Sequence, residues 1–176
     1  VASPKDMEET YLPAFEACVK DAGVEAVMGA YNRTNGEPCC GSETLLKDIL
    51  RGRWGFRGHV VSDCWAIRDF HTGHMVTENT AQSVALALKN GCDLNCGDCY
   101  RCLLLALREG LISEEDITIA AERLFTTRYL LGVLGEGSEY DSIPYEAVEC
   151  PEHLALAHKA TLESCVLLKN SGLLPL

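Results

Sequence analysis

The chain alternates short apolar segments with longer amphipathic ones, and this alternation constrains its fold more than any other feature. Residues 24–31, 58–63 and 92–95 are short and apolar, as buried strands are. Residues 42–53 and 80–89 lie between them and repeat apolar side chains at helical spacing. Strands that alternate with helices of ten or more residues indicate βα units and a parallel sheet. We therefore predict an α/β fold.

Further segments complete this arrangement. We expect four more helices, at residues 7–22, 100–109, 114–131 and 151–163, and a long loop after residue 63. About three strands are visible, whereas a complete (β/α)8 barrel takes about 250 residues, so any barrel formed here is partial. Gly-Glu-Gly-Ser-Glu-Tyr-Asp-Ser, at residues 135–142, has the composition of a linker.

Charge and hydropathy exclude two classes of partner. Acidic residues outnumber basic ones by 26 to 15 without any basic cluster, which argues against nucleic acid. No window approaches the roughly 20 apolar residues of a membrane span. The ten cysteines fall mostly within apolar patterns, as Cys18 and Cys165 do, so we expect reduced thiols and favour a cytoplasmic location. The first and last residues, Val1 and Leu176, suggest a fragment whose targeting segment is missing.

Asp63 is the first candidate for chemistry. It ends the apolar segment Gly-His-Val-Val-Ser-Asp, and the carboxyl ends of parallel strands are where α/β proteins place their active sites. Aspartate is also a common helix cap, so Asp63 could instead cap the next helix or turn. The spacing does not decide between these roles.

The surrounding motifs resemble those of family 3 glycoside hydrolases, which are retaining β-glycosidases. WGFRGHVVSD is similar to the family's nucleophile signature. ETYLPAFEACVKDAG and VMGAYNRTNGEPCCGSETLLKDILRG precede it in the family's order. ALALKNGCDLNCG, EGLISEEDI, RLFTTRYLLG and VLLKNSGLLPL follow it. The resemblance spans about residues 6–176.

This resemblance implies a fold and an activity. Residues 1–134 correspond to the C-terminal part of a (β/α)8 barrel, and residues 135–176 to a linker and the first elements of an α/β sandwich domain. Asp63 corresponds to the nucleophile, while the acid/base glutamate belongs to the part of the second domain that this chain lacks. A β-linked oligosaccharide or an aryl or alkyl β-glycoside is the implied substrate, with β-glucosidase the leading activity and β-xylosidase the alternative. The family needs no metal, and oligomeric state stays open.

Four further residues are candidates for the sugar site or its mouth. Tyr31 matches a tyrosine beside the nucleophile, and Met28 matches an apolar residue that lines the sugar pocket. The sequence departs from the family pattern at Ala30, where serine is usual, and at Trp65, where a small residue is common. Trp65 could stack on a sugar or pack within its loop. Asp93 could face the pocket mouth, or could cap a helix or turn.

Two patterns suggest rival functions. Cys92, Cys96 and Cys99 have the C-x3-C-x2-C spacing of an iron–sulfur site, and a structural zinc is a related alternative. His71 and His74 stand three apart and invite a metal interpretation, but no third ligand has convincing spacing. A loop that contacts substrate or a neighbouring chain is the preferred interpretation of the two histidines.

Overall fold

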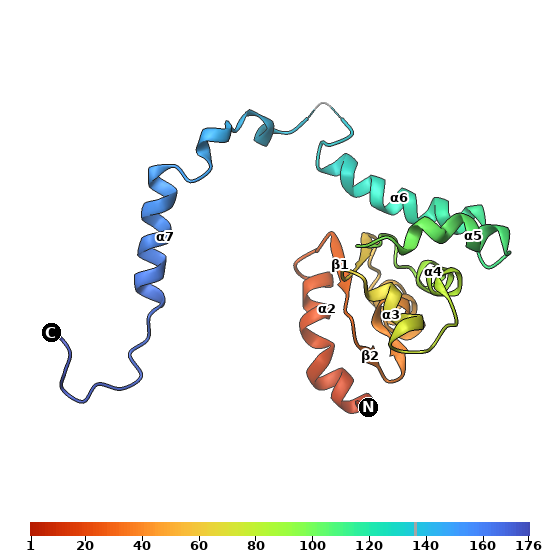
Figure 1. Ribbon diagram of the computed structural model, residues 1–176, viewed down its shortest axis with the longest axis horizontal. Helices are drawn as coiled ribbons and strands as arrows, with labels where there is room; N and C mark the ends of the chain where they lie inside the picture. Colours follow the sequence, from red (N-terminus) through yellow and green to blue (C-terminus); the bar gives the residue numbers. More distant parts are fainter. Residues whose placement is uncertain (136) are drawn as a thin grey trace. The chain divides into compact units, whose positions relative to one another are not determined.

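The chain consists of two compact units in a computed structural model that describes residues 1–135 and 137–176. The first unit runs to residue 136 and contains all of the strands, and the second comprises residues 137–176 (Figure 1).

A small parallel sheet organises the first unit and confirms the α/β prediction. β1 (Ala26–Gly29) pairs in parallel with β4 (His59–Ser62), with Val27 opposite Val60 and Gly29 opposite Ser62. The predicted third strand is reduced to one parallel bridge, between Val61 and Leu94. A separate antiparallel hairpin joins β2 (Arg33–Thr34) to β3 (Glu37–Pro38).

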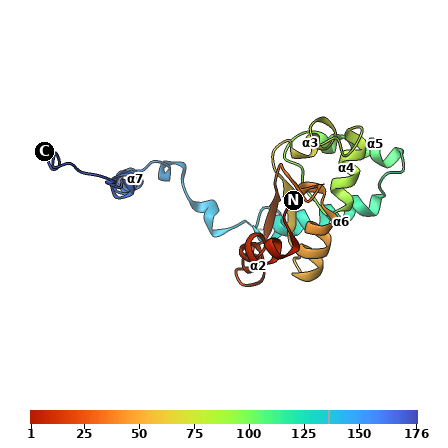
Figure 2. The same ribbon diagram turned by 90° about the horizontal axis from the view of Figure 1, so that it is seen from below.

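Helices flank this sheet, with α2 on one side of the strands and α3 and α4 on the other (Figures 1 and 2). In chain order they are α1 (Pro4–Asp6), η1 (Met7–Tyr11), α2 (Pro13–Lys20), η2 (Cys39–Gly41), η3 (Glu43–Arg53), α3 (Ala66–Thr72), α4 (Thr80–Lys89), η4 (Cys99–Cys102), α5 (Leu103–Arg108) and α6 (Glu114–Leu130). The side chains of Ser42, Asn79 and Ser113 accept backbone hydrogen bonds at the starts of η3, α4 and α6. These caps fix where the three helices begin.

Two segments differ from expectation. The helix predicted at residues 7–22 is divided at Leu12, because Pro13 has no N–H to donate and the preceding turn closes through a wider bond from Leu12 N to Met7 O. The prediction of a long loop after residue 63 is wrong in its first half, because α3 forms there. Ile67 and Phe70 anchor α3 because both are almost fully buried.

The core lies where β4 meets α3 and α4. Its largest apolar members that are essentially inaccessible to solvent are Phe70, Ile67, Val60, Val84, Cys40 and Cys92. Methylenes and rings removed from water here supply the main stabilisation of the unit.

β1 is less buried than a central strand, contrary to the expectation for residues 24–31. Only Gly29 of its four residues is buried, and Met28 is 59% exposed, because β1 has a strand neighbour on one side only. An open groove of about 640 Å³ runs beside it, between the N-terminal helices and η3. Its apolar lining includes Tyr11, Phe15 and Leu46.

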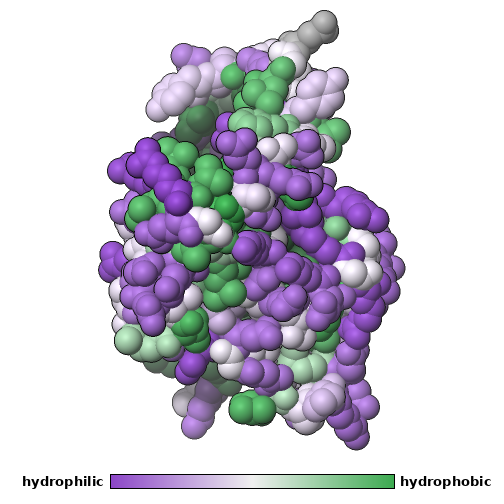
Figure 3. Space-filling model, turned by 90° about the vertical axis from the view of Figure 1, so that its right-hand side faces the viewer, coloured by the Kyte–Doolittle hydropathy of each residue, from purple (hydrophilic) through white to green (hydrophobic). Residues whose placement is uncertain are grey.

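The second unit contains η5 (Glu139–Ser142), η6 (Tyr145–Ala147) and α7 (Pro151–Ser164). Every residue of α7 is exposed, including Leu154, Leu156 and Leu162. Apolar side chains also reach the surface elsewhere, and Figure 3 shows green apolar residues among purple polar ones. Within the described residues, no helix has the length and apolar character to cross a membrane.

Candidate active site

The residues that follow β1, β4 and Leu94 meet at one edge of the sheet. The amide of Asp63 donates to the Gly29 carbonyl at 2.9 Å, and the amide of Ser62 donates to the Leu94 carbonyl at 2.8 Å. The Ser62 hydroxyl, which is buried, accepts the amide of Cys96 at 3.0 Å. The carboxyl ends of β1, of β4 and of the segment at Leu94 therefore lie together at one edge, where parallel α/β sheets place their active sites.

Asp63 is partly exposed at this edge. The amide of Cys64 donates to Asp63 Oδ1 at 2.7 Å, and the amide of Ala66 donates to the Asp63 carbonyl at 3.2 Å. The position before α3 is occupied by Trp65, and α3 has no side-chain cap. Asp63 therefore does not cap α3, although its Oδ1 accepts an amide of the turn that leads into that helix, and its partly exposed carboxylate lies at the rim of the sheet.

Met28, in β1, and Tyr31, just after this strand, come from the strand next to the one that Asp63 follows. Desolvation, together with the negative charge of Asp63, raises the pKa of Tyr31 above its ordinary value, so its hydroxyl stays protonated at neutral pH. Side chains alternate along a strand, so Met28, opposite Val61, lies on the face of the sheet opposite to that of Val60, which is in the core. Asp63 continues the alternation from Val61 onto that same face.

Trp65 is held in an unusual conformation beside Asp63. Its φ of 69° places its backbone in the left-handed region, which residues other than glycine seldom adopt. Its amide donates to the Cys96 carbonyl at 2.8 Å, and the Arg68 guanidinium lies 5.6 Å from its ring centroid. The indole remains 47% exposed, and a Cβ added at Gly97 would lie 3.4 Å from it. These contacts orient a large apolar ring that solvent or ligand can reach.

A disulfide joins Cys64 to Cys96, so the expectation of reduced thiols is wrong for this pair. The two cysteines follow neighbouring parallel segments, which brings their Cα atoms to 4.5 Å, within the range that a disulfide spans. The other eight cysteines carry free thiols. Because Cys96 is bonded to Cys64, the iron–sulfur or zinc set of Cys92, Cys96 and Cys99 is also wrong.

His71 and His74 bind different partners. His71 Nδ1 lies 2.9 Å from Ser83 Oγ, inside the contact between α3 and α4. His74 Nε2 lies 2.8 Å from the Tyr31 carbonyl oxygen, in the loop after β1. The described part of the chain contains no group of three or more histidine, cysteine or acidic side chains placed to hold a metal ion.

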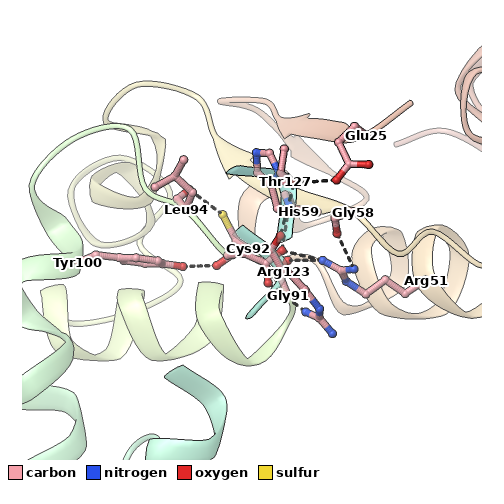
Figure 4. Close-up of polar contacts among 12 residues, drawn as sticks. Glu25, Arg51, Gly58, His59, Gly91, Cys92, Leu94, Tyr100, Arg123 and Thr127 are labelled. Atoms are coloured by element: carbon pink, nitrogen blue, oxygen red, sulfur yellow. Dashed lines mark hydrogen bonds and ion pairs between the residues drawn. The ribbon is translucent and has the colours of Figure 1, made fainter. Parts of the chain in front are cut away.

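Asp93 does not face the pocket mouth. Its side chain is 1% exposed and forms ion pairs with Arg51 at 2.7 Å and Arg123 at 3.0 Å, and Oδ2 also accepts the amide of Val60 at 2.8 Å. Burial lowers the pKa of Arg51, although the charge of Asp93 opposes this shift. Figure 4 shows Arg51 and Arg123 approaching each other from different helices. Asp93 therefore joins η3, α6 and β4 through its buried carboxylate.

A second hydrogen-bond network has two buried members, His59 and Thr127, and an exposed one, Glu25. Thr127 Oγ1 donates to Glu25 Oε1 at 2.7 Å, so His59 Nδ1, 2.9 Å from the same hydroxyl, donates its proton to it (Figure 4). This chain of bonds ties α6 to the starts of β1 and β4.

Two features of the site were missed from the sequence. The Cys64–Cys96 bond had a signal, since both cysteines follow predicted neighbouring strands within two residues of their ends. The bond from His74 to the Tyr31 carbonyl had none, because the two residues are 43 positions apart and the acceptor belongs to the backbone.

Comparison with known proteins places this geometry in a family context. The model of the glycosyl hydrolase family 3 N-terminal domain matches residues 1–127. A probable exo-1,4-beta-xylosidase of Aspergillus clavatus is 43% identical over 99% of the chain, which covers 23% of that protein. A xylan 1,4-beta-xylosidase of Xylanibacter ruminicola is 40% identical over 99% of the chain, which covers 21% of that protein. The chain thus spans about a quarter of the length of these relatives or slightly less.

Solved structures agree with the sequence relatives. An exo-beta-xylosidase in complex with a xylobiose aziridine activity-based probe superposes with a TM-score of 0.89 at 32% identity, over 99% of this chain and 23% of that one. A beta-glucosidase from Listeria innocua in complex with glucose superposes with a TM-score of 0.84 at 31% identity, over 99% of this chain and 24% of that one.

Proposed function

Because the chain belongs to glycosyl hydrolase family 3, we propose that it forms part of a retaining, exo-acting β-glycosidase in which Asp63 is the nucleophile. The longer protein is called the parent enzyme below. It removes a terminal non-reducing sugar from a β-linked oligosaccharide or a simple β-glycoside in two displacements. The observation that carries the proposal is a partly exposed carboxylate at the carboxyl edge of a parallel sheet, flanked by Tyr31 and an exposed Trp65.

The proposed chemistry assigns a step to each group. Asp63 attacks the anomeric carbon while an acid protonates the departing glycosidic oxygen, and water then hydrolyses the glycosyl-enzyme with the same group acting as base. In the family that acid/base is a glutamate of the second domain, beyond residue 176. The protonated hydroxyl of Tyr31 stabilises the carboxylate of Asp63 or the charge that develops in the transition state.

The proposed architecture assigns residues 1–134 to the C-terminal part of a (β/α)8 barrel. In it, the sheet face that carries Met28 and Asp63 becomes the barrel interior, so Met28 lines the sugar pocket. The unpaired edge of β1 and the apolar groove beside it support this assignment, because a further strand and helix of the barrel would cover both. Residues 135–176 form the linker and the first elements of the sandwich domain.

β-Xylosidase is the leading specificity and β-glucosidase the second candidate. The sequence motifs alone placed β-glucosidase first, but the curated relatives at about 40% identity are named xylosidases. The solved structures at about 30% identity include enzymes of both names, so β-glucosidase stays in consideration. The two sugars differ by one hydroxymethyl group, whose discrimination in an apolar pocket is worth roughly 10- to 200-fold.

The first experiment compares the parent enzyme with its Asp63→Ala variant on 4-nitrophenyl β-xyloside and β-glucoside. We expect the variant to lose roughly 10⁴-fold or more in kcat, as removal of a nucleophile does. Added azide should restore turnover and yield an α-glycosyl azide, because azide then occupies the face from which Asp63 attacks. The faster wild-type substrate identifies the sugar.

Asp48→Ala is the matched control, since Asp48 is an exposed aspartate on η3. It should retain wild-type rates on both substrates. Near wild-type activity of Asp63→Ala, or an azide product of β configuration, would overturn the assignment of Asp63.

A further inference from the structure

One hydrogen bond connects the loop after β1 to the turn after α3. His74 Nε2 lies 2.8 Å from the carbonyl oxygen of Tyr31, a residue 43 positions away in the sequence. A carbonyl accepts but does not donate, so Nε2 carries the proton. The neutral Nε2–H tautomer and the imidazolium both meet this requirement, and the bond therefore does not depend on the charge of the ring.

The turn that presents His74 is anchored to α3. The amides of Gly73 and His74 both donate to the Asp69 carbonyl, at 2.9 and 2.7 Å. The amide of Val76 donates to the carbonyl of Phe70, whose ring is 1% exposed in the core. Met75, between His74 and Val76, has a φ of 55° and reverses the direction of the chain. His74 is thus fixed to the helix rather than carried on a free loop.

The same helix begins at the proposed nucleophile. The amide of Ala66, the first residue of α3, donates to the Asp63 carbonyl at 3.2 Å. Contacts therefore run from Asp63 along α3 to His74 and across to the Tyr31 carbonyl. The amide of Asp63 also donates to the carbonyl of Gly29, two residues before Tyr31, at 2.9 Å. The backbone that carries Tyr31 is thus bonded on two sides to the segment that carries Asp63.

We propose that His74 is a positioning residue that holds the Tyr31 hydroxyl beside Asp63 by donating a hydrogen bond to the Tyr31 carbonyl. The inference rests on the proposed function, since it assumes that Asp63 and Tyr31 act in glycoside cleavage. Misplacement of a catalytic group by about 1 Å costs on the order of 100-fold in rate. Loss of the bond should therefore lower kcat by roughly 10- to 100-fold while KM changes little, because Nε2 of His74 is engaged by the Tyr31 carbonyl.

The test uses three substitutions in the parent enzyme, assayed on 4-nitrophenyl β-xyloside and β-glucoside. His74→Leu removes the donor and should show the loss in kcat. His74→Gln carries an amide N–H2 at a comparable reach and should recover most of it. If His74→Leu does not fold, His74→Asn supplies the comparison, because its shorter amide does not reach the carbonyl and should also lose kcat.

A double-mutant cycle separates positioning from general loss of structure. In a Tyr31→Phe background, His74→Leu should have little further effect on kcat, because the hydroxyl that it positions is already absent. His71→Leu is the control, because His71 is a structural histidine on α3 that bonds Ser83, and its loss should lower the melting temperature but not kcat.

The outcomes are distinct. Wild-type kcat in His74→Leu, or an equal loss in the Tyr31→Phe background, overturns the role of His74 while a dead Asp63→Ala variant leaves the proposed function standing. An active Asp63→Ala variant overturns the proposed function itself.

Discussion

Truncation of Asp93 should destabilise the first unit more than that of an exposed aspartate. Its carboxylate is 1% exposed and accepts from Arg51, Arg123 and the amide of Val60. Removal of one partner from a buried ion pair costs about 3–5 kcal/mol, because the remaining charge has lost both water and its counterion. Most of this cost comes from Arg51, whose side chain is only 13% exposed, whereas the side chain of Arg123 is 29% exposed and is better hydrated.

The buried amide of Val60 adds to the same loss. An unsatisfied buried donor costs about 1–3 kcal/mol, but this overlaps with the ion-pair term since one carboxylate serves all three donors. We therefore expect Asp93→Ala to lower the free energy of unfolding by about 3–5 kcal/mol in total. Asp93→Asn keeps an acceptor but not the charge, and should lose about 1.5–3 kcal/mol.

Hydrogen exchange at increasing urea measures this in the parent enzyme. The amides of residues 59–62 report opening of the first unit separately from other parts of the protein. Asp48→Ala is the control, and should stay within about 0.5 kcal/mol of wild type. Equal exchange in Asp93→Ala and Asp48→Ala would refute the reasoning.

Three further predictions concern the site and its surroundings. Alkylation of the unfolded, unreduced chain should label eight of its ten cysteines. Cys96→Ala removes the bond to Cys64, 32 positions away, and should lower the free energy of unfolding in urea by about 3–4 kcal/mol. Trp65→Ala should lower kcat/KM for xylobiose about tenfold, the equivalent of about 1.4 kcal/mol of stacking. Burial raises the pKa of Glu37, but hydrogen bonds from Ser42 and Thr44 outweigh it and leave that pKa below its ordinary value. Glu37 therefore stabilises the fold above about pH 4.3, and the advantage of wild type over Glu37→Gln in thermal melts should shrink as the pH falls below that value.

Much of the fold was predictable because its signals are local. The segment at residues 80–89 has the bounds of α4, and the segment at residues 42–53 contains η3, because apolar spacing acts within a few positions. α3 was missed because a left-handed Trp65 starts it and burial of Ile67 and Phe70 holds it, both of which depend on tertiary packing.

The site was predictable in part for the same reason. Asp63 stands at a strand end, which the sequence displays directly, and the structure places it at the sheet edge. The partners of Asp93 lie 42 and 30 positions away, on η3 and α6, so its ion pairs left no local pattern. An aspartate at a predicted strand end thus had two equally good interpretations, and only the packing of the helices distinguishes them.

The Asp93 network also bears on the order of folding. Its three donors span residues 51–123, so the network forms only after η3, the sheet and α6 have come together. Interactions that form after the rate-limiting step slow unfolding without accelerating folding. We expect a network that needs three assembled elements to form late, so Asp93→Asn should unfold faster than wild type in urea while its refolding rate stays close to that of wild type.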